Sequence, residues 1–354
     1  MWSFSGRPLV NVGGSSGRAA NFFMQNSIDY IIVGFGIAGA ILSYKLWKLN
    51  KTFIVYDAPS MASASSISSG LINPITGRRF VKSWHFEEIL PSLKATYRDI
   101  ESSLNITLLE QTNIHRSLFT VNDENLWETI ALNESDYCLT NEYAHSKWKN
   151  TITRRTRMGT IRAYRINVQL LIETLLNQYK SSYVCEPFEY DKVSIEAKRV
   201  NYKGNQAKKL IFCEGHYVKN NPFFSDLPME PVKGEVLYVR IPNFSPDSIL
   251  KDKVYLVPIG NEIFWVGSTY EWENLNNQPT EAKRTYIKQI LDDLLDVPYE
   301  IIDHKAGVRP STKERKPIVT IHPKHSELAA FNGLGTKGSS LAPYYADQLI
   351  QLIS

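Results

Sequence analysis

The segment that most constrains the fold is a glycine-rich turn between two apolar stretches near the start of the chain. Residues 29–33 have the composition of a short buried strand, residues 34–39 read Gly-Phe-Gly-Ile-Ala-Gly, and residues 40–46 carry the apolar stripe of a helix. A second apolar stretch at 52–56 is followed by Asp57, 18 positions after the last glycine of the turn. This order of strand, glycine turn, helix, strand and acid predicts a Rossmann-like unit that binds a dinucleotide.

Each part of this unit has a physical role. Gly34 permits a tight turn, Gly36 lets the backbone approach a pyrophosphate, and Gly39 lets the helix pack closely on the strand. Unpaired N–H groups at the helix start attract phosphate, and Asp57 can accept hydrogen bonds from a ribose diol. Glycine turns between a strand and a helix also occur without ligands, so the prediction depends on the whole pattern rather than on the turn.

Composition limits the class of protein. The chain has 354 residues, 43% of them hydrophobic, which predicts about two domains and a substantial core. The net charge of +4 does not by itself indicate binding to nucleic acid or to a membrane surface. The three cysteines are widely spaced without a CxxC pair, which predicts neither a metal site nor disulfides and favours a cytoplasmic location.

No stretch in the body of the sequence predicts a membrane-spanning helix. The longest uncharged stretch in the body of the chain, residues 30–44, is shorter than the roughly 18 to 20 residues of a spanning helix. Residues 1–23 contain no acidic residue and are interpreted as a disordered extension ahead of Met24, with a targeting segment as the alternative.

Two later segments indicate which dinucleotide is bound. Residues 62–74 are rich in small hydroxyl side chains and end in Gly-Leu-Ile-Asn-Pro, which a flexible linker does not need. Residues 331–343 form a second glycine-rich loop, followed by a helix at 344–353. Such a loop can be a plain strand-to-helix connection, but two of them predict a long ligand held at both ends, as FAD would be.

The chain resembles the D-amino-acid-oxidase-like FAD-dependent oxidoreductases, in particular glycine oxidase and the flavin domain of the bifunctional tRNA enzyme that matures 5-carboxymethylaminomethyluridine. The resemblance depends on several short motifs that occur in the family's order. They are the first glycine turn with its acid, and the segments 65–74, 210–215, 255–258, 266–269, 307–312 and 333–343.

The resemblance implies an FAD held without a covalent bond, because none of the cysteines lies near the segments expected beside the flavin ring. Residues of the first turn would bind the ADP part of FAD: Gly34, Gly36, Ile37, Ala38, Gly39 and Asp57. Further contacts to the phosphates, the adenine and one side of the ring would come from Ser65, Ser66, Gly70, Leu71, Phe188 and Gly215. The second loop would follow the pyrimidine side of the flavin with Gly333, Leu334, Gly335, Thr336, Lys337, Gly338 and Ser339.

On the substrate side, the resemblance implies that Arg309 binds a carboxylate, which suits the planar fork of a guanidinium. Tyr255 is the second candidate, since its hydroxyl can reach the same carboxylate. A structural ion pair for Arg309 and a core position for Tyr255 are the alternatives. Tyr270 and His85 are weaker candidates.

The function that the resemblance implies is oxidation of the C–N bond of a small carboxylated amine or amino acid, with hydride transfer to flavin and oxygen or another acceptor as the oxidant. One alternative is oxidation of a tRNA wobble-uridine side chain, from carboxymethylaminomethyl to aminomethyl. Residues 333–338, Gly-Leu-Gly-Thr-Lys-Gly, resemble the flavin loop of the tRNA enzyme more than that of glycine oxidase. The second support for this alternative is a set of basic residues, which can also be a solvated face: Arg78, Arg79, Lys82, Arg154, Arg155, Arg157, Arg162 and Arg165. A flavoprotein subunit without turnover is the other alternative, and the oligomeric state is open.

The expected fold class is α/β, with a Rossmann-like FAD-binding domain interleaved with an α+β substrate domain on a mostly antiparallel sheet. The FAD-binding domain is predicted at 24–75, 155–225 and 303–354, and the substrate domain at 76–154 and 226–302. Strands are expected at 236–241, 254–257 and 263–266, and a helix at 280–295.

Overall fold

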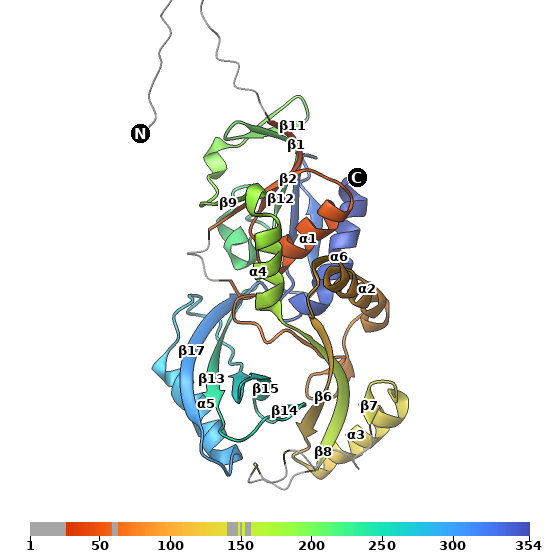
Figure 1. Ribbon diagram of the computed structural model, residues 1–354, viewed down its shortest axis with the longest axis vertical. Helices are drawn as coiled ribbons and strands as arrows, with labels where there is room; N and C mark the ends of the chain where they lie inside the picture. Colours follow the sequence, from red (N-terminus) through yellow and green to blue (C-terminus); the bar gives the residue numbers. More distant parts are fainter. Residues whose placement is uncertain (1–25, 59–62, 140–147, 149–150, 153–156) are drawn as a thin grey trace, which may run out of the picture.

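The computed structural model describes residues 26–58, 63–139, 148, 151–152 and 157–354, and two β-sheets organise them (Figure 1). The eight-stranded sheet comprises β1 (Asn26–Val33), β2 (Phe53–Asp57), β9 (Tyr183–Cys185), β10 (Ser194–Glu196), β11 (Arg199–Tyr202), β12 (Asn205–Phe212), β18 (Ile318–Ile321) and β19 (Leu328–Asn332). The nine-stranded sheet comprises β3 (Leu71–Ile72), β6 (Leu109–Ser117), β7 (Cys138–Leu139), β8 (Met158–Ile166), β13 (Val232–Arg240), β14 (Ile249–Lys251), β15 (Tyr255–Gly260), β16 (Ile263–Gly267) and β17 (Glu300–Arg309).

The helices lie on the outer sides of these sheets. They are α1 (Ile37–Lys48), α2 (Phe86–Leu104), α3 (Val121–Asn133), α4 (Val168–Gln178), α5 (Glu281–Leu294) and α6 (Gly338–Ile353). Short connections complete the described chain: the hairpin β4 (Ile75–Thr76) and β5 (Val81–Lys82), and the single turns η2 (Lys180–Ser182), η3 (Tyr190–Lys192) and η4 (Gly215–Asn220). Figure 1 shows α1, α2, α4 and α6 around the eight-stranded sheet and α5 on the outside of the nine-stranded one.

Five neighbouring strands of the eight-stranded sheet are parallel, in the order β9, β2, β1, β12 and β19. The apolar run of β1 is buried on both faces: Ile32 packs in the cluster that includes α1, and Ile31 packs in the cluster on the opposite face. Burial on both faces explains why this strand is continuously apolar instead of alternating. The Rossmann-like half of the predicted fold class is therefore confirmed.

The nine-stranded sheet is mostly antiparallel, with one parallel pair between β6 and β14. The expected strands near 236–241, 254–257 and 263–266 correspond to β13, β15 and β16, which confirms the second half of the fold class. On one face, Leu237 and Leu256 pack with Leu291 of α5. On the other face, Val236 and Trp265 belong to the same cluster as α1 and α6. That second face therefore points toward the eight-stranded sheet.

The residue ranges of the two domains stay a prediction, and residues 1–23 lie outside the described part of the chain. Hydrogen bonding places β3, β8 and β17 in the nine-stranded sheet. We therefore propose that the boundaries follow the sheets, with these three strands assigned to the substrate domain.

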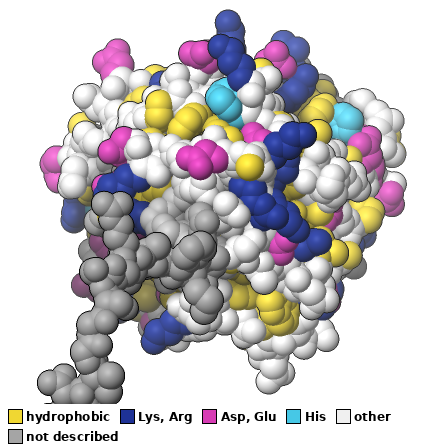
Figure 2. Space-filling view, turned by 90° about the horizontal axis from the view of Figure 1, so that it is seen from above, with side chains coloured by type: hydrophobic (Ala, Val, Ile, Leu, Met, Phe, Trp, Pro, Cys, Tyr) yellow, Lys and Arg dark blue, Asp and Glu magenta, His cyan; other side chains and the backbone are white. Residues whose placement is uncertain are grey.

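Charge is spread over the surface that Figure 2 shows, where Lys and Arg side chains lie beside Asp and Glu side chains. Among the described residues, no helix is both long enough and apolar enough to cross a bilayer. The same residues contain no group of three or more metal-ligating side chains.

Candidate functional site

Four of the segments singled out in the sequence meet at one edge of the eight-stranded sheet. The strands β1, β2, β12 and β19 are parallel, so their carboxyl ends lie together. The first glycine turn follows β1, Asp57 ends β2, Gly215 comes shortly after β12, and the second glycine loop follows β19. Ligands of open α/β sheets bind at this edge.

The glycines of the first turn are required by close backbone contacts. Gly34 has a φ of +95°, and a Cβ there would lie 2.5 Å from the carbonyl oxygen of Cys213. A Cβ at Gly39 would lie 2.0 Å from the carbonyl oxygen of Gly34. Both contacts are with backbone, which cannot move aside as a flexible side chain can. These glycines therefore let the end of β1 pack between β12 and the start of α1.

The acid at the end of β2 is held beside this turn. Phe35 N–H donates to Asp57 Oδ1 at 3.1 Å, and Tyr183 Oη donates to Asp57 Oδ2 at 3.0 Å. Burial raises the pKa of Asp57, and these hydrogen bonds oppose the rise. The carboxyl group is thus fixed at the place where a ribose would meet it.

The segment that contains Ser65 and Ser66 lies over the start of α1. Ile37 N–H donates to Ser65 Oγ at 3.0 Å, and a Cβ at Gly36 would lie 3.2 Å from the same oxygen. Ser66 is exposed, and its carbonyl oxygen accepts a hydrogen bond from Gln169. The structure therefore brings Ser65 to the helix start with Gly36, Ile37 and Ala38.

Gly70 and Leu71 connect this segment to the nine-stranded sheet. Gly70 has a φ of +71°, and a Cβ there would lie 1.8 Å from the carbonyl oxygen of Ile166. Leu71 pairs with Arg165 across β3 and β8. The Arg165 guanidinium donates to the carbonyl oxygens of Ser69 and Pro258. This part of the predicted site therefore lies at the junction of the two sheets.

The second glycine loop meets the first. A Cβ at Gly338 would lie 2.9 Å from Ile37 Cγ2, so the starts of α6 and α1 are neighbours. Gly333 and Gly335 have positive φ values of 74° and 53°, and Gly335 N–H donates to the carbonyl oxygen of Pro310. The loop thus runs from the start of α1 toward the segment that contains Arg309.

Side chains of the second loop differ in exposure. Leu334 and Ser339 are buried, and Thr336 is exposed. Lys337 lies 3.3 Å from Ser83 Oγ, and burial lowers the pKa of Lys337. A partly buried ammonium group in this loop can stabilise negative charge nearby.

Two further predicted contact residues, Phe188 and Gly215, each come three residues after a strand, β9 and β12 respectively. Phe188 stacks on Tyr202 with ring centroids 4.2 Å apart, within an aromatic cluster that also contains Tyr56, Tyr190 and Phe212. The carbonyl oxygen of Gly215 accepts from Asn332, the last residue of β19. β9 ends at Cys185, so Phe188 lies beyond the strand instead of at its end. The contact of Phe188 with adenine stays a prediction.

Arg309 ends β17 and lies across β13 on the face that points toward the eight-stranded sheet. A Cβ at Gly234 would lie 1.8 Å from Arg309 Nη2, so only glycine leaves room for the guanidinium. Arg309 donates to the carbonyl oxygens of Lys233 and Thr269 and to Ser268 Oγ, and its Cζ is 4.7 Å from the centroid of the Tyr270 ring. Burial lowers the pKa of Arg309. No carboxylate of the described residues pairs with it.

Tyr255 lies in the same part of the sheet. It pairs with Gly267, the residue before Ser268, so Tyr255 and the Arg309 guanidinium approach the same end of β16. Tyr255 Oη accepts from Asn73 Nδ2 at 3.2 Å, and burial raises the pKa of Tyr255. The structure thus brings the two predicted substrate residues together. His85, the weaker candidate, instead pairs with Glu88 at the start of α2.

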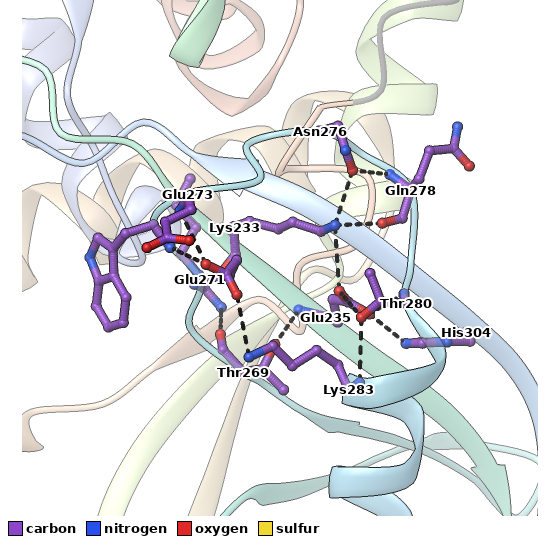
Figure 3. Close-up of polar contacts among 12 residues, drawn as sticks. Lys233, Glu235, Thr269, Glu271, Glu273, Asn276, Gln278, Thr280, Lys283 and His304 are labelled. Atoms are coloured by element: carbon purple, nitrogen blue, oxygen red, sulfur yellow. Dashed lines mark hydrogen bonds and ion pairs between the residues drawn. The ribbon is translucent and has the colours of Figure 1, made fainter.

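A buried polar network on the opposite face of β13 supports the Arg309 site (Figure 3). Lys233 and Glu235 are each 1% exposed and 3.4 Å apart. Lys233 Nζ also donates to Asn276 Oδ1, while Glu235 accepts from the backbone and the hydroxyl of Thr280. The network fixes the connection between β16 and α5, which supplies two of the acceptors for Arg309.

Sequence reasoning did not single out Lys233, Glu235 or Gly234. These residues lie inside a strand whose alternation looks like ordinary sheet, and no local motif marks them. Asn73 and Ser268 lay within quoted motifs but had no assigned role. Only contacts between segments that are distant in the sequence show what each of the five does.

The residues at the sheet edge fit FAD. The starts of α1 and α6 have no acidic residue in their first turns and no side-chain cap from Gly36 or Lys337, so neither repels a phosphate. Asp57 lies at the end of β2 for a ribose, and the two glycine loops adjoin. These features fit one long ligand held by two loops, and the individual contacts stay predictions.

Comparison with known proteins identifies the family. A family model described as FAD dependent oxidoreductase (DAO) matches residues 29–352. Glycine oxidase of Pseudomonas aeruginosa is 30% identical over 169 residues, which cover 46% of this chain and 45% of that protein. The chain thus matches less than half the length of this curated relative.

Solved structures share the fold. Glycine oxidase from Geobacillus kaustophilus has a TM-score of 0.78 and 18% identity, covering 93% of this chain and 95% of that one. L-amino acid deaminase from Proteus vulgaris has a TM-score of 0.76 and 10% identity, covering 97% and 96%. Because the family model spans nearly the whole chain, the protein belongs to the family of FAD-dependent oxidoreductases that includes glycine oxidase.

Proposed function

We propose that this protein oxidises the C–N bond of a carboxylated amine or amino acid, with non-covalently bound FAD as the hydride acceptor. The family supplies the cofactor, and the substrate class is inferred from the residues that face it. Oxygen or another acceptor would then reoxidise the flavin.

The observation that carries the proposal is the environment of Arg309. Its guanidinium is largely buried, and the described residues around it offer neutral acceptors only: two carbonyl oxygens and a hydroxyl. A buried cation without a counter-ion is costly, and a carboxylate that arrives with the substrate would remove that cost. Arginine can bind this group through two parallel N–H bonds.

Tyr255 is arranged to assist. Its oxygen accepts from Asn73, which leaves the phenolic proton free to donate to a second oxygen of the substrate carboxylate. Burial raises its pKa, so the hydroxyl remains protonated at neutral pH. Tyr255 thus orients the carboxylate, and Arg309 supplies the charge.

The chemistry follows from positioning. Bound FAD would supply the acceptor for the hydride that leaves the substrate α-carbon. Arg309 and Tyr255 would hold the carboxylate so that this carbon faces the ring, and the buried Lys337 would favour negative charge on that side of the site. The imine product would hydrolyse in water to a carbonyl compound and an amine.

A second candidate, oxidation of a tRNA side chain, has one supporting observation. Tyr270 and Trp272 are 54% and 64% exposed and stack with ring centroids 6.1 Å apart, as a platform for a base would, and the Tyr270 ring contacts the Arg309 guanidinium. Against it, Lys82 pairs with Glu87 and Glu134. Arg154 and Arg155 lie outside the described residues. Salt-sensitive binding of tRNA would favour this candidate, and no binding at low salt would oppose it.

The role of Arg309 is tested by replacing it. Arg309→Ala should raise the KM for a carboxylated amine about tenfold or more, because a charge-assisted pair of hydrogen bonds is lost. The flavin absorption of the purified variant should stay at the wild-type level, since no predicted FAD contact is removed. Steady-state kinetics and an absorption spectrum measure the two effects.

Arg240→Ala is the matched control, because Arg240 lies on the same strand layer but is exposed and pairs with Glu300. It should leave KM unchanged. An Arg309→Ala enzyme with wild-type KM would exclude the assigned role. A wild-type flavoprotein that no amine reduces would instead indicate the subunit without turnover.

A further inference from the structure

Two cations that no sequence motif marked lie beside Tyr255. Arg116 on β6 pairs in register with Lys251 on β14, and Lys251 pairs with Tyr255 on β15. Residues in register on neighbouring strands project from the same face of a sheet. All three side chains therefore share the face that carries Arg309.

The contacts of these two cations are with rings and carbonyl groups. Arg116 Cζ lies 4.4 Å from the centroid of the Phe80 ring, and Lys251 Nζ lies 4.8 Å from the centroid of the Tyr255 ring. Lys251 Nζ also donates to the carbonyl oxygens of Asp252 and Lys253. Neither cation has an ion pair with a carboxylate in the described part of the chain.

Two acids attract these cations, and the carboxylate of each accepts from backbone N–H groups instead of pairing with a cation. Asp123 attracts Arg116, but its carboxylate accepts from the backbone of Phe119 and Thr120 at the start of α3. Asp252, the residue after the end of β14, attracts Lys251, but it is buried and its carboxylate accepts from Lys253 N–H instead of from Lys251 Nζ.

The partial burial of both cations is unfavourable without an anion. Burial, and then the charge of Arg116, lowers the pKa of Lys251 to about 8. Burial also lowers the pKa of Arg116. Surface lysines and arginines escape this cost by extending into water, whereas these two remain in a partly buried position beside the substrate residues.

We propose that the substrate carries a second anionic group, a carboxylate or a phosphate, which Arg116 and Lys251 bind. The inference builds on the proposed function, in which Arg309 binds the first carboxylate. The hydride transfer and the imine hydrolysis are unchanged: the α-carbon loses a hydride to the flavin, the nitrogen loses its proton to water, and the second anion takes no part in bond changes.

The strand spacing sets the length of such a substrate. From β6, the order of strands is β14, β15 and β16, and the Arg309 guanidinium contacts Ser268 just after β16. Three strand spacings amount to ~14 Å along the sheet. A glycine whose nitrogen carries an anionic tail of several bonds would place one charge at each end of this row, with Tyr255 between them.

The experiment compares N-substituted glycines with tails of equal length that end in a carboxylate, a phosphonate or a methyl group. In the wild-type holoenzyme, we expect the anionic tails to lower KM about tenfold or more relative to the methyl tail, through charge-assisted contacts. A phosphonate that outperforms the carboxylate indicates a phosphate-bearing substrate, and the reverse order indicates a dicarboxylate.

Substitutions test whether Arg116 and Lys251 cause the preference for anionic tails. Arg116→Gln and Lys251→Met should each remove most of the preference for anionic tails while the KM of the methyl-tail compound stays the same. Lys305→Met is the control, because Lys305 lies in the same row of the sheet but pairs with Asp303. Equal KM values for all tails in the wild type would overturn the inference and leave the proposed function intact.

A second readout does not depend on turnover. Calorimetry should show that an alkane dicarboxylate of matched length binds the holoenzyme about tenfold more tightly than the monocarboxylate, and that Lys251→Met removes most of the difference. If this preference is present but no amine reduces the flavin, the proposed function fails while the second anion site stands. If dicarboxylate and monocarboxylate bind equally, the anion site is refuted.

Discussion

At several positions of this site, close contacts leave no room for any side chain, so only glycine fits. Gly39 faces the carbonyl oxygen of Gly34, Gly70 faces that of Ile166, and Gly234 leaves the space that the Arg309 guanidinium fills. Arg309 and Lys251 show the complementary case, in which a partly buried cation forms no ion pair with an acid among the residues that the structure describes. The first group fixes the backbone, and the second leaves charge for a ligand to neutralise.

The Lys251 ammonium group predicts a pH dependence. Its pKa is lowered to about 8, so it is charged below this pH and neutral above it. Binding of a second anion should therefore weaken as pH rises through about 8, while Arg116 stays charged and retains part of the attraction. The ratio of the Kd values for the monocarboxylate and the dicarboxylate should fall accordingly between about pH 7 and pH 9.

Lys251→Met is the control for this profile, and its ratio should not change over the same range. A wild-type ratio that is flat with pH, or one that rises, would contradict the part assigned to Lys251. Of the groups that face it across the sheet, Arg116 on β6 stays charged in this range, and Tyr255 on β15, whose pKa burial raises, stays neutral.

At the scale of elements, β13 separates two kinds of polar group. On one face Gly234 accommodates Arg309, and on the other Lys233 and Glu235 form a buried ion pair. The pair also binds the connection that precedes α5, which starts after its cap residue Thr280. Helix, connection and strand therefore position Arg309 as one unit.

Breaking the buried pair tests this arrangement. Glu235→Ala leaves Lys233 buried without its acid, which should lower the free energy of unfolding by about 3 to 5 kcal/mol. The KM for a carboxylated amine should rise as well, because the connection supplies acceptors for Arg309. Urea unfolding and steady-state kinetics measure the two effects.

The control is Lys283→Met, which breaks the partly exposed pair with Glu271 in the same connection. It should change the free energy of unfolding by less than about 1 kcal/mol. If Glu235→Ala unfolds like this control and keeps the wild-type KM, the pair has no positioning role.

At the scale of the whole molecule, the site lies where the edge of one sheet meets a face of the other. Segments far apart in sequence supply the cofactor side because the carboxyl ends of parallel strands converge. In the proposed function the mostly antiparallel sheet supplies the substrate side, and α5 covers its outer face (Figure 1). We propose that the flavin ring and the amine meet at this junction.

Local patterns were enough to predict much of this arrangement. The first strand, glycine turn, helix and Asp57 are contiguous in sequence, so their geometry follows from short-range rules. The helix predicted at 280–295 corresponds to α5, with Thr280 as its cap. Arg309 and Tyr255 were assigned through family motifs, and the structure brings them together.

The remaining residues of the site could not be predicted from the sequence, because only pairing between distant strands brings them together. Arg116 and Lys251 meet only because β6 and β14 pair in parallel, although they are distant in the chain. Lys233 and Glu235 look like the polar positions of an ordinary alternating strand, yet both are buried. Neither arrangement has a local signal, because register between distant strands is set by the packing of the whole sheet.

The central claim is that this flavoprotein takes hydride from carboxylated amines that Arg309 binds. Anaerobic mixing of the purified holoenzyme with matched pairs of amines, with and without the α-carboxylate, tests it most directly. We predict loss of the flavin absorption near roughly 450 nm with the carboxylated member of a pair and none with its decarboxylated partner. Equal bleaching by both members, or bleaching by neither across the panel, would contradict the account.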